Sequence, residues 1–246
     1  MTKNHSIDRR TLLRLGAGAA LAPFAFSVPS MAQSPAGGAM KIGVVGSGKL
    51  GGTVGGLWVK AGHQVLFSSR HPEELKGLVD GLGANARAGA VAEAVAFGDV
   101  VLIAVPYAAL PEVGRDNAAA LKGKVVLDAC NPIAGRDGDI VNEAVANGVG
   151  ETSAKYLPGT RLVRAFNSFG ARSFASEAHR AGEPIGVPIA SDDPEAIKVA
   201  SRLVRDAGFE PVAVPLARAR EFAPPEALFR QALPVSELKA RLGIKG

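Results

Sequence analysis

The chain has 246 residues, of which 47% are hydrophobic and 21% are charged, with one cysteine and a formal net charge of +5. This composition excludes an intrinsically disordered chain, which combines low hydrophobicity with high net charge. The lone Cys130 has no intrachain partner, which excludes a disulfide scaffold.

The first 32 residues have the pattern of a secretory signal of the twin-arginine type. Arg9 and Arg10 precede an apolar stretch at residues 16–26, and the small residues Ser30 and Ala32 form an exit for cleavage. This stretch is shorter than the about 20 residues that a membrane-spanning helix needs. We therefore expect export to the periplasm by the twin-arginine route, with an uncleaved N-terminal membrane anchor as the alternative. Residues 33–39 are expected to be a flexible spacer.

The signal segment also explains most of the net charge. Residues 1–32 hold four basic residues and one acidic residue, and so account for +3 of the +5. The rest of the chain is nearly neutral, and it lacks the basic runs of a nucleic-acid binder. No later apolar run reaches the length of a membrane span, so an integral membrane protein is not expected.

From residue 40 onward, short β-branched runs alternate with alanine-rich stretches, which is typical of βα units. Several runs are apolar throughout, as expected for strands that are covered on both faces. We predict an α/β fold: a Rossmann-type, doubly wound, mainly parallel sheet in a single domain over residues 40–246, with a short helical C-terminal tail. The predicted strands are residues 41–45, 64–67, 100–105, 125–128, 161–166, 185–190 and 210–214. The predicted helices are residues 50–61, 72–80, 91–97, 171–179 and 194–207.

The strongest local motif is the run Gly46-Ser47-Gly48-Lys49-Leu50-Gly51, which reads G-x-G-x-x-G between a predicted strand and a predicted helix. In such a motif the first glycine allows a tight turn, the second allows the backbone to approach a pyrophosphate, and the third allows the helix to pack on the strand. The helix N-terminus offers N–H groups to the phosphates. The motif predicts a dinucleotide site, with a purely structural turn as the alternative.

The end of the second predicted strand indicates which dinucleotide. An NAD site usually carries Asp or Glu about 20 residues beyond the motif, but this chain has Ser69 and Arg70 there. A guanidinium beside a hydroxyl suits a 2′-phosphate, through charge-assisted hydrogen bonds. We therefore predict NADP(H) rather than NAD(H); a solvated surface arginine is the alternative.

Three further segments carry a family resemblance: residues 99–107 (DVVLIAVPY), 125–132 (VVLDACNP) and 162–168 (LVRAFNS). Together with the glycine motif and residues 68–70, they resemble the NADPH-dependent coenzyme F-420 reductases, and the related dinucleotide-binding domain of ferric metalloreductases. The resemblance spans roughly residues 40–222. It implies an NADPH-dependent oxidoreductase that transfers a hydride between NADP(H) and a flavin or deazaflavin such as coenzyme F-420.

The resemblance also implies the site residues. For the pyrophosphate these are Ser47, Gly48, Lys49 and Leu50, and for the 2′-phosphate Ser69 and Arg70. Along the rest of the cofactor they are Ala104, Val105, Pro106, Asn131, Pro132, Val163 and Ala165. Asn167 and Ser168 are expected beside the substrate.

Hydride transfer to a ring needs orientation more than acid–base groups, and the sequence shows no proton relay or metal-ligand spacing, so we predict no catalytic side chain and no metal. His63, His71 and His179 are expected in turns or on the surface, and Cys130 as a packed thiol.

The expected partner is a small redox acceptor. Because the tail is too short for a separate substrate domain, a homodimer is also considered. The alternatives are an exported NADP-binding sensor or scaffold without turnover, and a flavin-mediated ferric reductase.

Overall fold

The computed structural model of the chain describes Met1 and residues 37–245. The predicted signal peptide at 1–32 and most of the predicted spacer lie outside the described residues. The account that follows concerns residues 37–245.

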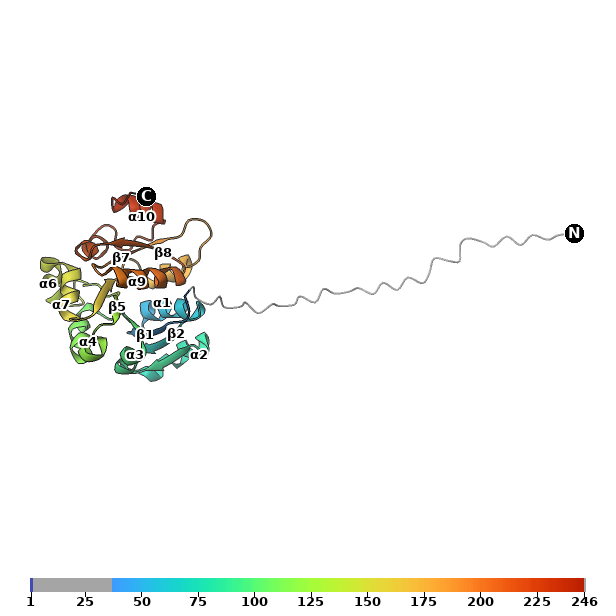
Figure 1. Ribbon diagram of the computed structural model, residues 1–246, viewed down its shortest axis with the longest axis horizontal. Coiled ribbons are helices and arrows are strands. Elements are labelled where there is room, and N and C mark those ends of the chain that lie inside the picture. Colours follow the sequence, from blue (N-terminus) through green and yellow to red (C-terminus); the bar gives the residue numbers. More distant parts are fainter. Residues whose placement is uncertain (2–36, 246) are drawn as a thin grey trace. The chain divides into compact units, whose positions relative to one another are not determined.

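A single eight-stranded sheet runs through the molecule in the order β3-β2-β1-β4-β5-β6-β7-β8 (Figure 1). Neighbouring strands are parallel except for β6 and β7, which are antiparallel. The prediction of a doubly wound, mainly parallel Rossmann-type sheet is confirmed. The strands are β1 (Lys41–Val45), β2 (Gln64–Ser68), β3 (Ala86–Gly89), β4 (Val100–Ile103), β5 (Val125–Asp128), β6 (Arg161–Arg164), β7 (Gly186–Ala190) and β8 (Glu210–Val214).

Helices connect the strands and cover both faces of the sheet (Figure 1). The α-helices are α1 (Lys49–Lys60), α2 (Lys76–Leu82), α3 (Val91–Phe97), α4 (Leu110–Asp116), α5 (Ala118–Leu121), α6 (Ile140–Asn147), α7 (Val149–Tyr156), α8 (Ala171–Glu177), α9 (Pro194–Asp206) and α10 (Val235–Arg241). The 3-10 helices are η1 (Pro72–Leu75), η2 (Tyr107–Ala109) and η3 (Leu216–Phe222).

Two predicted strands are shorter than expected. The strands predicted at residues 100–105 and 161–166 extend too far, because β4 ends at Ile103 and β6 ends at Arg164. Phe166 has a φ of 61°, which a strand does not allow, so the chain leaves the sheet at this point. The residues after β4 and β6 are therefore loop residues at the carboxyl edge of the sheet.

Other differences concern elements that carry a weak apolar pattern. The edge strand β3 was not predicted, and two of its four residues are exposed. Helices α4 to α7 were not predicted either; none exceeds eight residues. The predicted helix 72–80 is η1 followed by α2.

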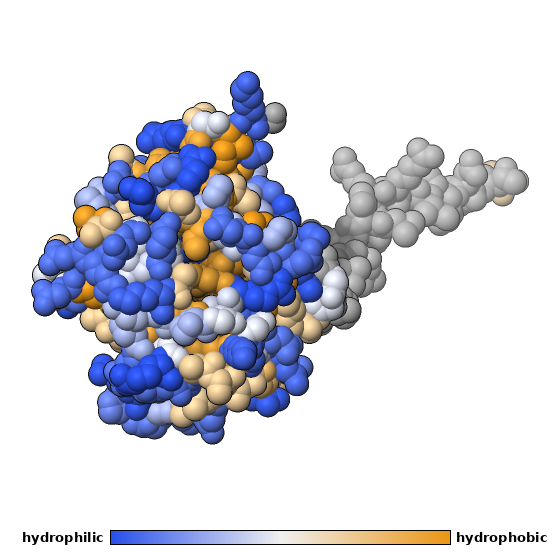
Figure 2. Space-filling model, turned by 60° about the vertical axis from the view of Figure 1, so that its left-hand side comes forward, coloured by the Kyte–Doolittle hydropathy of each residue, from blue (hydrophilic) through white to orange (hydrophobic). Residues whose placement is uncertain are grey.

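The central strands alternate between two hydrophobic cores, one on each face of the sheet. Val44 and Leu102 pack with side chains of α1, α8 and α9 in the first core. Their neighbours Val45 and Ile103 pack with side chains of α3 to α7, η3 and α10 in the second. This alternation explains why the strands read as unbroken apolar runs. On the face seen in Figure 2, an apolar band lies between hydrophilic surfaces.

A buried cluster ties α1 and the start of β1 to α9. Trp58 Nε1 donates to the carbonyl of Leu203 at 2.8 Å. His63 accepts from the Met40 N–H at 3.1 Å through Nδ1, while its Nε2 lies 3.0 Å from a carboxylate oxygen of Asp206. Burial lowers the pKa of His63, although Asp206 opposes the shift. His63 lies in the predicted turn, but it is fully buried and has a structural role that the sequence did not predict.

No helix within the described part of the chain is long and apolar enough to cross a membrane. The same residues contain no group of His, Cys, Asp and Glu side chains placed to hold a metal ion.

Candidate functional site

The glycine motif forms the turn between β1 and α1. Gly46 has a φ of +91°, and the N–H groups of Gly46 and Ser47 both donate to the carbonyl of Ser68, at 3.2 and 2.9 Å. A Cβ on Gly46 would lie 2.6 Å from the carbonyl oxygen of Ala104. The turn therefore lies in contact with the ends of both β2 and β4, and only glycine fits at position 46.

The other two glycines of the motif have different surroundings. A Cβ on Gly51 would lie 2.2 Å from the carbonyl oxygen of Gly46 and 3.1 Å from Val44 Cγ1, so this glycine allows α1 to pack on β1. A Cβ on Gly48 would meet nothing within 4 Å. The structure does not need a glycine at position 48 for packing, and the space above its backbone is open.

The start of α1 has unpaired donors. No side chain caps the helix at Gly48, and its first turn contains no acidic residue. The Ser47 hydroxyl is buried and has no hydrogen-bond partner among residues 37–245. Unpaired helix N–H groups and a buried unpaired hydroxyl together suit an anionic group such as a pyrophosphate. The residues present fit the phosphates of a dinucleotide.

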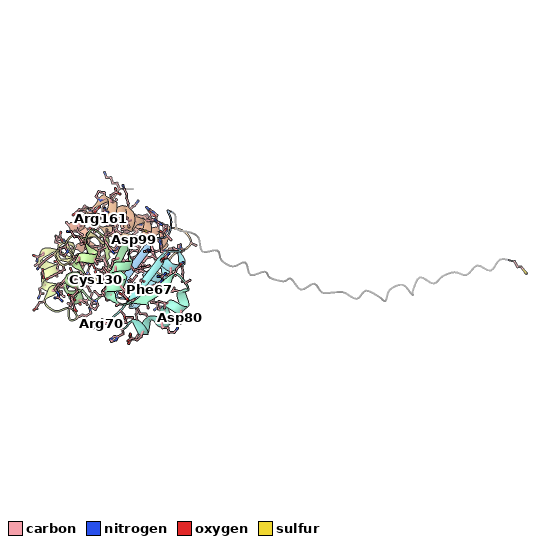
Figure 3. All side chains as sticks on the ribbon, turned by 60° about the horizontal axis from the view of Figure 1, so that its bottom comes forward. Phe67, Arg70, Asp80, Asp99, Cys130 and Arg161 are labelled. Atoms are coloured by element: carbon pink, nitrogen blue, oxygen red, sulfur yellow. The ribbon has the colours of Figure 1, made fainter. Side chains whose placement is uncertain are left out.

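Ser69 and Arg70 follow β2, directly beside the glycine turn in the sheet. Ser69 Oγ accepts a hydrogen bond from the N–H of His71 at 2.9 Å, which leaves its own proton free to donate. Arg70 is exposed and forms no ion pair within the described residues. It lies at the margin of the molecule, away from the buried Cys130 (Figure 3). A guanidinium in this setting is available to an external phosphate.

A cleft of about 400 Å³ opens at the carboxyl edge of the sheet, next to the start of α1. It collects residues from the loops after β4, β5 and β6, where a doubly wound sheet binds its ligands. Six predicted site residues line it, namely Leu50, Ala104, Val105, Pro106, Asn131 and Asn167. The lining residues that sequence reasoning missed are Ala129, Ile133, Arg136, Phe169, Gly170, Phe229 and Arg230.

Two asparagines hold the loops after β5 and β6 together at the cleft. Asn131 Nδ2 donates to the Asn167 carbonyl at 2.7 Å, and Asn167 Nδ2 donates to Asn131 Oδ1 at 3.1 Å. Asn167 is 2% exposed, and its Oδ1 has no partner in the described part of the chain. Such an orphaned acceptor in a cleft is a place for a ligand N–H.

A buried ion pair, not anticipated from the sequence, supports this asparagine pair. Arg164 Nη1 donates to Asp128 Oδ2 at 2.6 Å, and both side chains are fully buried. Arg164 also reaches Asn131 Oδ1 at 3.3 Å and Ser153 Oγ at 3.3 Å. Asp128 Oδ1 accepts from the Cys130 N–H at 2.8 Å, so this carboxylate also supports the loop after β5. The pair therefore positions the loop that carries Asn131.

Four other predicted site residues do not line the cleft, namely Pro132, Val163, Ala165 and Ser168. Val163 and Ala165 have fully buried side chains, so only their backbone could meet a ligand. Ser168 is buried, and its hydroxyl has no partner in residues 37–245. Pro132 lines a different cavity, beside Ala223 and the two prolines that follow it.

Cys130 is buried at the end of β5. Burial raises the pKa of its thiol, with the nearby Asp128 carboxylate adding to the shift. A thiol in this state is a poor nucleophile. The prediction of a packed thiol is confirmed.

Comparison with known proteins places these features in context. Residues 41–132 match the family described as NADP oxidoreductase coenzyme F420-dependent. Metalloreductase STEAP3 of Rattus norvegicus is 31% identical over 187 residues, which cover 74% of this chain and 36% of that protein. The chain thus spans about a third of the length of this curated relative.

Solved structures share the fold at lower identity. Hypothetical protein SMa0349 from Sinorhizobium meliloti superposes with a TM-score of 0.69 at 23% identity, covering 80% of this chain and 95% of that one. A protein described as an F420-dependent NADP-reductase, from Arthrobacter sp. FB24, gives a TM-score of 0.66 at 24% identity, covering 83% of this chain and 96% of that one.

Proposed function

Since residues 41–132 match the family described as NADP oxidoreductase coenzyme F420-dependent, we propose that this chain transfers a hydride between NADP(H) and a flavin or deazaflavin acceptor. The observation that carries the proposal is the position of the open helix N-terminus. The uncapped start of α1 and the open space at Gly48 adjoin a cleft that is large enough for a ring.

The cofactor would be held along one line of residues at the carboxyl edge of the sheet. Ser47 and the first N–H groups of α1 would bind its pyrophosphate, and Ser69 and Arg70 its 2′-phosphate. Asn167 Oδ1 is placed to accept an N–H from a ring in the cleft. The nicotinamide would supply the hydride.

The chain's own contribution is orientation and exclusion of water. Ala104, Val105 and Pro106 form an apolar wall of the cleft, and Phe169 adds an aromatic surface. The lining contains no Asp, Glu, His, Cys or Lys, so it offers no proton relay. Holding two rings in reacting geometry is itself a large part of the catalytic effect in such reactions.

Anaerobic stopped-flow measurement of NADPH oxidation tests the proposal. FMN, FAD and coenzyme F-420 are offered separately, and NADPH binding is measured in parallel by calorimetry. We expect oxidation with at least one ring acceptor at a rate that saturates with its concentration. Tight NADPH binding without oxidation by any acceptor would refute it and favour a sensor or scaffold.

The similarity to a metalloreductase supports a second candidate, in which a reduced flavin passes electrons to ferric iron. Ferric chelates with and without FMN in the same experiment distinguish the two. Reduction of the chelate only when FMN is present supports the second candidate.

We also propose export by the twin-arginine route, on the basis of Arg9 and Arg10 before the apolar stretch. Because this route carries folded proteins, the chain could leave the cytoplasm with its cofactor bound. Cell fractionation, followed by nucleotide analysis of the protein recovered from the envelope, tests this. Cytoplasmic protein with an intact N-terminus would contradict it.

A further inference from the structure

Two arginines line the cleft, and the cofactor proposed above does not require either of them. Arg136 lies in the loop after β5, and Arg230 lies in the tail between η3 and α10. We infer that Arg136 and Arg230 bind a phosphate group of the acceptor, so that the natural acceptor is a phosphorylated ring compound. This inference rests on the proposed function, because it assigns the second substrate of the same cleft.

The two arginines lie away from the places assigned to the phosphates of the cofactor. Strand β5, which precedes the loop with Arg136, is two strands from β1 in the sheet. Strand β6, which precedes the loop that Arg230 contacts, is three strands from β1. Adjacent strands are about 4.8 Å apart. Arg136 and Arg230 are therefore roughly 10–14 Å along the sheet from the glycine turn.

Arg136 is fixed in position by its neighbours. Its Nη2 donates to the Asn131 carbonyl at 2.9 Å and to Asp137 Oδ2 at 2.7 Å, and its Nε lies 3.0 Å from Asp137 Oδ1. The Asp137 carboxylate is fully buried and also accepts N–H groups from Ala108 and Ile133. The Arg136 side chain remains 48% exposed, and its Nη1 has no partner in residues 37–245. One edge of the guanidinium is therefore anchored, and the other is available.

Arg230 has an unusual backbone and no carboxylate partner. Its φ is +67°, a region that residues other than glycine rarely occupy, and its N–H donates to the Ser168 carbonyl at 2.6 Å. The guanidinium carbon lies 5.3 Å from the centre of the Phe229 ring. Among the residues that the structure describes, no Asp or Glu pairs with it. Strained residues at a ligand cleft are often kept for binding.

The charge of the cleft favours an anion. Of the two arginines in its lining, Arg136 is paired with the buried Asp137, whereas Arg230 has no carboxylate partner within residues 37–245, so the charge at the cleft is positive. Guanidinium groups bind phosphate through paired N–H donors, which makes arginine better suited than lysine to this role. With Phe169 and Phe229 also in the lining, the cleft combines aromatic surface for a ring with positive charge for a phosphate.

Riboflavin and FMN form a matched pair for the test, because they share the ring and differ by one phosphate. The dissociation constant of each is measured by flavin fluorescence with wild type, Arg230→Gln and Arg136→Gln. Arg241→Gln, on α10, is the control for loss of surface charge. We expect wild type to bind FMN at least tenfold more tightly than riboflavin. Arg230→Gln should bring the ratio close to one, with unchanged affinity for riboflavin and NADPH.

Measurements of flavin binding and of NADPH oxidation test the phosphate site and the proposed hydride transfer separately. If wild type prefers FMN in binding but oxidises NADPH neither with a flavin nor with coenzyme F-420, the proposed function fails and the phosphate site stands. Equal affinity for FMN and riboflavin in wild type overturns the inference. It is also overturned if Arg230→Gln weakens NADPH binding instead of FMN binding, since the arginine would then serve the cofactor. Circular dichroism and thermal melting confirm that each variant is folded; if Arg136→Gln is not, the Arg230 variant carries the test.

Discussion

The second and third glycines of the motif at the start of α1 should be separable by mutation into one that serves binding, Gly48, and one that serves packing, Gly51. In Gly51→Ala the new Cβ would lie 2.2 Å from the carbonyl oxygen of Gly46, whereas ordinary contacts begin near 3.4 Å. Helix α1 must therefore move by roughly 1 Å, or the turn must open, and overpacking of this kind costs about 1–3 kcal/mol. Alanine recovers up to about 1 kcal/mol through its higher helix propensity.

We expect Gly51→Ala to lower the free energy of unfolding by about 1–2 kcal/mol. Gly48→Ala meets no atom within 4 Å and keeps an extended φ of −70°. Its stability should change by less than about 1 kcal/mol, the cost of alanine at a helix N-cap. Its Cβ would, however, occupy the space where a pyrophosphate must approach. The affinity for NADPH should therefore fall at least about tenfold, which corresponds to about 1.4 kcal/mol.

Urea denaturation and calorimetric titration with NADPH measure the two effects on the same preparations. Gly77→Ala is a matched control, since this glycine lies near the start of another helix and a Cβ there also meets nothing within 4 Å. Wild-type affinity of Gly48→Ala for NADPH would show that no phosphate lies over this backbone. A Gly51→Ala protein as stable as wild type would refute the packing role.

Three further outcomes follow from named contacts. Asp128→Asn should lower the free energy of unfolding by about 3–5 kcal/mol, because it leaves Arg164 buried without a counter-charge. Urea denaturation measures this loss, and the double variant Asp128→Asn/Arg164→Met should recover part of it. A double variant no more stable than Asp128→Asn would contradict this account. Arg70→Ala should weaken NADPH binding about tenfold or more while leaving NADH binding unchanged. An equal loss of affinity for NADPH and NADH would argue against a 2′-phosphate contact. So would a similar loss of NADPH affinity in the control variant Arg241→Ala. The pKa of His63 is lowered by burial, so the unfolded state takes up its proton first as pH falls below about 6.5. The free energy of unfolding should therefore fall more steeply between pH 7 and pH 5 in wild type than in His63→Gln, and parallel curves would refute the assignment.

The parts of the fold that were predictable are those whose residues carry a strong local pattern. The central strands are apolar on both faces because each face meets a core, and α3 begins and ends where its sequence predicts. Strand β3 (Ala-Arg-Ala-Gly) has no such pattern, because it lies at the edge of the sheet and is largely exposed. Its pairing with β2 is a property of the fold and not of its own residues.

The site divides in the same way. The glycine turn is a contiguous motif and is readable from the sequence, whereas Asp128 and Arg164 are 36 residues apart and meet because β5 and β6 pair in register. Their opposite charges at the ends of two predicted neighbouring strands are a signal that could have identified the pair. Arg230 offers no local signal. It reaches the cleft because its backbone bonds to Ser168, a contact between the tail and the loop after β6.

Trp58 gives the protein a built-in optical reporter. It is the only tryptophan in the chain, it is fully buried, and its indole N–H is bonded to Leu203 of α9. Trp58 lies nine residues after Lys49, the first residue of α1. It is therefore about 13 Å along the helix axis from the turn that faces the proposed cofactor. Tryptophan emission overlaps NADPH absorption, so arrival of the nucleotide should quench this single emitter by energy transfer. The unlabelled protein can therefore report its own cofactor occupancy in real time.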